Sequence, residues 1–254
     1  MPVIVPVLAM CSAAYGAVAG ALLPRAVYRL AVPPETPWRR QCPSGHRLAG
    51  PAHGWLGRAR CPACAGATPE VPASYGTSER LLAGICASAC AALALSVGVR
   101  PELAVWLTAA PIVLLLTAVD IRAQRLPDIL TLPLTAATAA LLGVAALATG
   151  AGGSWTGALL GGTVLAAGFF VLFLINPRGM GFGDVKLAAP LGLALGWYGW
   201  DTVLAGTLLA FLFAAGYGVT LLLAGRASWK TSVPFGPFLA AGTLAGIVLG
   251  GLTT

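Results

Sequence analysis

Long apolar runs alternate with short polar segments along most of the chain. Each run approaches the roughly 20 residues that a helix needs to cross the hydrocarbon core of a bilayer. The pattern predicts eight transmembrane helices, at about 3–23, 81–99, 102–119, 129–149, 156–176, 185–200, 202–224 and 235–252. The sixth and seventh are separated only by the short break Gly199-Trp200-Asp201. We therefore expect an all-α polytopic membrane protein.

The composition excludes most other classes of protein. Of the 254 residues, 58% are hydrophobic and 9% are charged, whereas a soluble domain carries roughly a quarter charged residues. Such a chain lacks the polar groups to cover a water-facing surface, which excludes a soluble globular enzyme. Glycine has no strict period, and Leu, Ala and Val dominate, so collagen-like and disordered chains are excluded as well.

The charges are sorted along the chain. The 15 Lys and Arg residues outnumber the 8 acids, for a net charge of +7. If residues 24–80 are cytoplasmic, 14 of the 15 positive residues fall in cytoplasmic loops, and only Arg100 lies outside. The positive-inside rule then places both termini outside, with eight spans. The first run is interpreted as a retained span, because the basic residues follow it. Since the positive charge marks loops at a bilayer, we expect no nucleic-acid partner.

Three regions follow from this pattern, at 1–23, 24–80 and 81–254. The first is a transmembrane helix and the third holds the remaining spans. The middle segment is rich in Pro, Arg and Cys, shows no helical periodicity and is too small to build a core unaided. We expect it to be a small loop-rich cytoplasmic insertion after the first helix.

Small residues recur four positions apart within several runs. The sets are Gly16/Gly20, Gly157/Gly161, Gly192/Gly196 and Gly242/Gly246/Gly250. Such spacing lets helix backbones approach closely in lipid. Because the chain holds 33 glycines, chance also explains any one pair.

Three acids lie at or beside apolar runs on the side predicted to be cytoplasmic. Asp120 ends the third run, Asp128 begins the fourth after Pro127, and Asp184 opens the sixth. A charge at membrane depth costs at least a few kcal/mol, so such acids usually have a function. Each also has a structural interpretation, since an acid is an ordinary feature of a helix end at the interface.

Two such carboxylates within hydrogen-bonding reach cannot both ionise easily, so the pair holds one proton. The ionised member can take a proton from water while the neutral member polarises a peptide carbonyl, which is the chemistry of aspartyl proteolysis. This chemistry needs no metal, Ser or His, and the predicted spans contain no His.

The residues around Asp184 suit this chemistry. Three glycines, Gly179, Gly181 and Gly183, permit unusual backbone angles and close approach. Asp184 is expected near a helix N-cap, where the helix dipole favours its anion, and Lys186 adds positive charge nearby.

Four segments carry recognisable motifs. Residues 179–187 (GMGFGDVKL) contain G-x-G-D, and residues 119–128 (VDIRAQRLPD) run from an aspartate to Leu-Pro-Asp. Residues 233–239 (VPFGPFL) contain Pro-Phe-Gly-Pro before the last run, and residues 16–30 end in Tyr-Arg-Leu. In this order, and over nearly the whole chain, the segments resemble those of the type IV prepilin peptidases, the bacterial leader peptidases of pili and type II secretion.

The resemblance implies a reaction and a site. Asp120 and Asp184 would be the catalytic dyad, with Gly181, Gly183, Lys186 and Asp128 in support, in a transmembrane peptidase domain over 81–254. The dyad would cut the leader of prepilin or pseudopilin substrates just after a Gly. The cut would fall at the cytoplasmic face of the bacterial inner membrane, within the lipid bilayer and without a cofactor.

Two other functions stay open at this point. A multi-helix transporter would use broken helices and buried acids for ion coupling, although no inverted repeat is visible and the insertion 24–80 has no counterpart. A catalytically silent pilus or secretion assembly subunit is the other, although both aspartates are present.

The insertion carries half of a zinc site. Cys61-Pro62-Ala63-Cys64 has the spacing at which two thiolates share a tetrahedral ion. In the family the other half is a second C-x-x-C, which here reads Cys42-Pro43-Ser44-Gly45. His46 would complete a Cys3His site with Cys42, and His53 is a second candidate. A metal-free loop is the alternative.

Many family members also methylate the new N-terminus with S-adenosylmethionine, and this N-terminal region is implicated. The family's Gly-Ser-Phe-Leu-Asn segment here reads Gly20-Ala21-Leu22-Leu23-Pro24, without the Ser and Asn. S-adenosylmethionine is therefore a cofactor only if methylation is retained.

Overall fold

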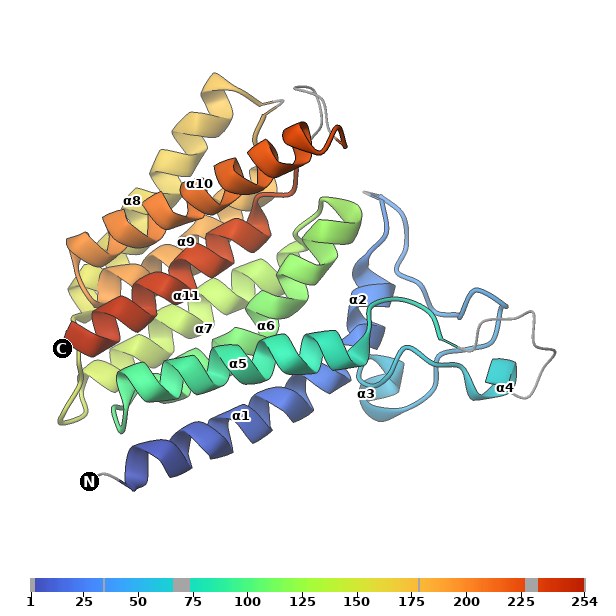
Figure 1. The fold of residues 1–254 in the computed structure, drawn as a ribbon, viewed down its shortest axis with the longest axis horizontal. Helices are drawn as coiled ribbons and strands as arrows, with labels where there is room; N and C mark the ends of the chain where they lie inside the picture. The colour runs from blue at the N-terminus through green and yellow to red at the C-terminus, as the bar shows by residue number, and fades with distance from the viewer. Residues whose placement is uncertain (1–2, 34, 66–73, 178, 227–232, 254) are drawn as a thin grey trace.

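The computed structural model describes residues 3–33, 35–65, 74–177, 179–226 and 233–253. Within these residues the fold is helical, with two isolated β-bridges and no strand. The described residues form eight long helices, which lie alongside one another in a bundle (Figure 1). They are α1 (Ile4–Leu22), α5 (Glu79–Val97), α6 (Glu102–Ala123), α7 (Asp128–Ala146), α8 (Trp155–Ile175), α9 (Phe182–Trp197), α10 (Trp200–Leu223) and α11 (Gly236–Thr253).

Seven of these helices are long and apolar enough to cross a membrane. The prediction of a polytopic all-α membrane protein is therefore confirmed, but α9, the predicted sixth span, is not among the seven. Its 16 residues extend only about 24 Å at 1.5 Å per residue, against the roughly 30 Å of a hydrocarbon core. The break after it falls at Tyr198–Gly199, where Gly199 has a φ of 107°, and α10 begins at Trp200.

The short helix α9 lies in the interior of the bundle. It packs against α7, α8, α10 and α11, and most of its side chains are buried. By contrast, α10 is largely exposed along its length. An apolar run in the sequence does not distinguish the two, because an interior helix and a lipid-facing helix are both hydrophobic on every side.

Small residues mark the closest helix contacts, as the four-residue spacing predicts. Helices α8 and α9 run antiparallel with Gly157 and Gly161 against Gly192 and Gly196. A Cβ on Gly161 would lie 2.6 Å from the Cα of Gly196. The same holds for Gly16 and Gly20 of α1 against α5, and for Gly242 and Gly246 of α11 against α10. These glycines let backbones touch in the absence of a hydrophobic driving force between helices.

The segment between α1 and α5 lies beyond one end of the bundle (Figure 1). Its described residues form three short helices, α2 (Pro24–Leu30), α3 (Pro51–Gly54) and α4 (Pro62–Ala65). Its small core contains Cys42, Ala59, Cys61, Cys64 and Tyr75. The Arg125 side chain donates to the carbonyl of Pro33 at 3.2 Å and ties the segment to the α6–α7 connection. The expected loop-rich insertion is thus present and contacts the bundle.

Candidate functional site

Asp120 and Asp184 line one cleft, as the sequence predicts. Asp120 lies in the last turn of α6 and Asp184 in the first turn of α9, and their exposed fractions are 6% and 7%. The cleft has a volume of about 610 Å³, and the charges of the two carboxylates interact across it. Two helix ends that are far apart in the sequence therefore bring two buried acids to one cleft.

Each aspartate is held by one backbone N–H. The N–H of Gly236 donates to Oδ2 of Asp120 at 3.1 Å, and the N–H of Gly181 donates to Oδ2 of Asp184 at 3.3 Å. Among the described residues, no group donates to Oδ1 of either side chain. One oxygen of each carboxylate is thus held in place by the backbone.

The turn before α9 places Asp184. Gly181 is the N-cap and Asp184 is the third helical residue, so Asp184 lies near the N-cap as the sequence predicts. The N–H of Asp184 donates to the carbonyl of Gly181 at 3.0 Å while its carboxylate accepts from the Gly181 N–H. The second of these bonds is one half of a capping box, in which the side chain of the third helical residue accepts from the N–H of the N-cap. It orients the carboxylate along the start of the helix.

The glycines of this turn allow close packing, and they do not adopt unusual backbone angles. Gly181 has an ordinary extended φ of −74°, and neither Gly179 nor Gly183 has a positive φ, so that part of the prediction is wrong. Close approach is confirmed at Gly183, where a Cβ would lie 3.1 Å from the Leu126 side chain. Gly183 lets α9 begin directly against the α6–α7 connection.

Lys186 pairs with Asp128 instead of supplying charge to Asp184. Its Nζ donates to Oδ1 of Asp128, and it lies 4.9 Å from the ring centre of Phe182. Asp128 is the first residue of α7 after Pro127, so its role as a helix start is also confirmed. The ion pair joins the start of α7 to the start of α9 at the rim of the cleft, which both residues line.

Sequence reasoning missed two residues of the site. Gly236 belongs to the Pro-Phe-Gly-Pro segment, which carried a signal but no assigned partner. Trp38 of the insertion also lines the cleft, and nothing in the sequence pattern indicated it.

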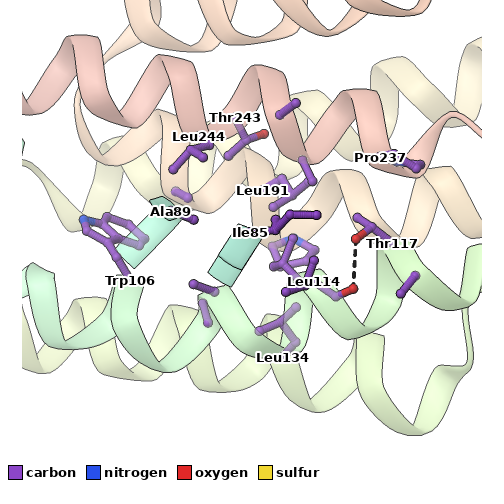
Figure 2. A pocket seen from close by; sticks show the side chains of 18 of the residues that line it. Ile85, Ala89, Trp106, Leu114, Thr117, Leu134, Leu191, Pro237, Thr243 and Leu244 are labelled. Atoms are coloured by element: carbon purple, nitrogen blue, oxygen red, sulfur yellow. Dashed lines mark hydrogen bonds between the residues drawn. The ribbon is translucent and has the colours of Figure 1, made fainter. Parts of the chain in front are cut away.

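A hydrophobic groove reaches the turn of α6 that carries Asp120. It has a volume of about 530 Å³ and lies between α5, α6 and α11, with α7 and α9 also contributing. Figure 2 shows Trp106 near one end and Thr117 and Pro237 near the other. Thr117 precedes Asp120 by one helical turn, and Pro237 follows Gly236. The groove therefore flanks the hydrogen-bonded pair Asp120–Gly236.

The insertion gathers a second set of chemical groups. The ligand atoms of Cys42, His46, Cys61 and Cys64 all lie within 4.8 Å of one another. Nδ1 of His46 is 3.5, 3.7 and 3.4 Å from the three sulfurs in that order, and the sulfurs of Cys42 and Cys64 are 3.8 Å apart. Tetrahedral zinc bonds imply ligand separations of about 3.6 Å for N–S and 3.8 Å for S–S. The four residues fit a zinc ion.

The surroundings of Cys42 favour metal binding, whereas His53 does not belong to the cluster. Burial raises the pKa of Cys42, but hydrogen bonds from His46 and Ser44 outweigh it and lower the pKa to about 6, which favours the thiolate that binds metal. His53, the other candidate ligand, lies outside the cluster, and its carbonyl accepts a hydrogen bond from Arg29 at 3.1 Å.

The fold and the site together define a multi-pass membrane protein with a paired-carboxylate cleft at one end of its bundle. Comparison with known proteins identifies its family. The model of the type IV leader peptidase family matches residues 107–219, which include both aspartates. The chain belongs to the type IV leader peptidase family.

Three of the relatives are named prepilin leader peptidase/N-methyltransferase. One from Stutzerimonas stutzeri is 30% identical over 91% of this chain and 87% of its own length. One from Aeromonas hydrophila is 34% identical over 75% and 62%, and one from Burkholderia pseudomallei (strain 1026b) is 35% identical over 54% and 43%. The last two matches thus span less than two thirds of those relatives. No solved structure matches. Family membership favours a peptidase over a transporter or a silent assembly subunit.

Proposed function

We propose that this protein is an intramembrane aspartyl endopeptidase. It would cleave the leader of type IV prepilin-like proteins just after a Gly. The observation that carries the proposal is the pair of buried carboxylates in one cleft, each held by a single backbone N–H. The substrate class is inferred from the names of the relatives, which are prepilin leader peptidases.

The chemistry follows from one proton shared by two acids. The ionised carboxylate takes a proton from a water held between the pair, and the neutral carboxyl donates a hydrogen bond to the oxygen of the scissile peptide. The water oxygen bonds to the carbonyl carbon, and the carbonyl electrons move to its oxygen, which the neutral carboxyl stabilises. The carbonyl then re-forms and the carbon–nitrogen bond breaks. The leaving amine then takes a proton from the carboxyl that received one from water, which restores the shared proton. The hydrogen bonds from Gly236 and Gly181 hold the two side chains in position for these transfers.

The location is part of the proposal. Segment 24–80, the α6–α7 connection and the start of α9 all carry positive residues, which the positive-inside rule assigns to the cytoplasm. The dyad lies at this end of the helices, so we place it at the cytoplasmic face of the inner membrane. In this arrangement residues 81–254 hold the peptidase domain. The insertion would contribute Trp38 to the cleft and hold a structural zinc ion through Cys42, His46, Cys61 and Cys64.

The test is leader cleavage by variants of the full chain. Asp120→Asn and Asp184→Asn should each abolish cleavage of a co-expressed prepilin, read as the mass of its mature N-terminus. Asp201→Asn is the matched control, because Asp201 is an exposed acid in the first turn of α10. Full cleavage by either dyad variant would overturn the proposal, and so would equal loss in the Asp201 variant.

A further inference from the structure

Arg29 is a buried cation that has no anionic partner among the residues that the structure describes. It lies in α2 and is 8% exposed. Its Nη1 donates to the His53 carbonyl at 3.1 Å, while its buried Nε has no hydrogen-bond partner. No described carboxylate forms an ion pair with it. A buried charge that is left unpaired destabilises a protein, so a bound anion would stabilise Arg29.

A cavity of about 640 Å³ opens beside this side chain. Its other lining residues include Arg40, Trp38 and Trp55. The guanidinium carbon of Arg29 lies 4.1 Å from the ring centre of Trp55, and Trp38 meets Trp55 edge to face at 5.3 Å. Stacking of this kind fixes the plane of the guanidinium and leaves its edge for hydrogen bonds.

The surroundings of the cavity are positive. Burial, followed by the charges of Arg40 and Arg25, lowers the pKa of Arg29. Glu35 is the single acid among the described lining residues. Its side chain is exposed and forms no ion pair with a described residue. An anion in this cavity would relieve the repulsion between the arginines and satisfy the free edge of Arg29.

We propose that Arg29, Arg40, Trp38 and Trp55 form a binding site for a phosphate group. Nε of Arg29, which has no partner among the described residues, shares one edge of the guanidinium with Nη2. This is the edge that binds two oxygens of an oxyanion at once. A second guanidinium from Arg40 suits the additional oxygens of a phosphate. The phosphate belongs either to an acidic phospholipid headgroup or to a soluble phosphate compound. This site goes beyond the peptidase reaction, and it adjoins the aspartate cleft through Trp38, which lines both.

The test measures stabilisation of the full-length protein by inorganic phosphate. In nanodiscs of neutral lipid, the unfolding midpoint should rise with phosphate concentration and saturate, as expected for a ligand that binds only the folded state. Arg29→Gln should abolish the rise and Arg40→Gln should weaken it. Arg80→Gln is the matched control, because Arg80 is exposed and lines none of the cavities described above. It should respond as the unmodified protein does.

A second set of nanodiscs separates the two sources of phosphate. If a lipid headgroup occupies the site, nanodiscs containing phosphatidylglycerol should raise the midpoint without added phosphate, and the rise should depend on Arg29 and Arg40. If the natural ligand is soluble, the response to inorganic phosphate should be the same in both lipids. If Arg29→Gln fails to fold, the response of Arg40→Gln tests the site instead, because Arg40 is exposed. An unchanged response in Arg40→Gln, or no response of the unmodified protein to phosphate or to acidic lipid, would overturn the site.

Discussion

The backbone N–H of Gly236 donates a hydrogen bond to Oδ2 of Asp120 across 116 positions of sequence. The bond joins the last turn of α6 to the first residue of α11. Both residues are buried, so the bond acts where water does not compete with it. The start of α11 is therefore part of the machinery that positions the first aspartate.

Replacement of Gly236 by Ala should impair cleavage without unfolding the protein. A Cβ at this position would lie 2.7 Å from Oδ2 of Asp120, so the carboxylate must shift and the hydrogen bond is weakened. A hydrogen bond to a charged group contributes about 1.5–3 kcal/mol, so we expect roughly a tenfold to hundredfold loss in kcat/KM. Leader cleavage by purified protein in detergent measures this loss.

Gly216→Ala supplies the control for that variant. Gly216 lies within α10, and a Cβ there meets nothing within 4 Å. Its cleavage rate should stay near that of the unmodified protein. A Gly236→Ala variant as active as Gly216→Ala would show that the hydrogen bond does not position Asp120.

The sequence was sufficient to predict that Asp120 and Asp184 lie at the same end of the bundle. Two spans separate them, so the chain returns to the same side between the two acids. It was not sufficient to find the bond to Gly236 or the pairing of Lys186 with Asp128, because these depend on how helices rotate and pack. Nor could hydropathy show that α9 is short and interior, since burial in protein and exposure to lipid select the same apolar residues.

The ion pair between Asp128 and Lys186 should contribute little stability. The two side chains are 56% and 25% exposed, so water screens their attraction. Exposed pairs typically contribute at most about 1 kcal/mol. A double-mutant cycle of Asp128→Asn and Lys186→Met, measured by chemical unfolding in detergent, should give a coupling energy in that range.

The same two variants should retain at least partial cleavage, because Asp128 and Lys186 stand at the rim of the cleft and bond to each other, not to either buried aspartate. If Asp128→Asn were as inactive as Asp184→Asn, Asp128 would have to take part in the reaction itself.

Gly161→Ala should destabilise the protein. The added Cβ would lie 2.6 Å from the Cα of Gly196 and 2.7 Å from the carbonyl oxygen of Gly192, so α8 and α9 must move apart. Overpacking of this kind costs roughly 1–3 kcal/mol. Thermal unfolding should show a lower midpoint, whereas Gly168→Ala on the same helix, with nothing within 4 Å of its Cβ, should not. Equal midpoints would mean that the α8–α9 contact tolerates separation.

The Cys3His cluster should bind one zinc ion per chain, and His46 should be required for full occupancy. His46→Ala leaves three sulfurs, which cannot close a tetrahedral structural site. Metal analysis of purified protein should therefore show a clear loss of zinc in this variant and in Cys61→Ser. His53→Ala should keep its metal, because His53 lies outside the cluster.

The replacement His46→Cys gives the sharper form of this test. It would restore four thiolates, the ligand set expected from two C-x-x-C pairs, and zinc content should recover relative to His46→Ala. Because the proposed cleavage uses only the two aspartates and water, His46→Ala should still cleave a leader as long as the insertion keeps Trp38 at the cleft. If zinc content were the same in the unmodified protein and in all four variants, the cluster would not be a metal site. Cleavage that follows zinc content would instead show that the metal holds the insertion against the dyad.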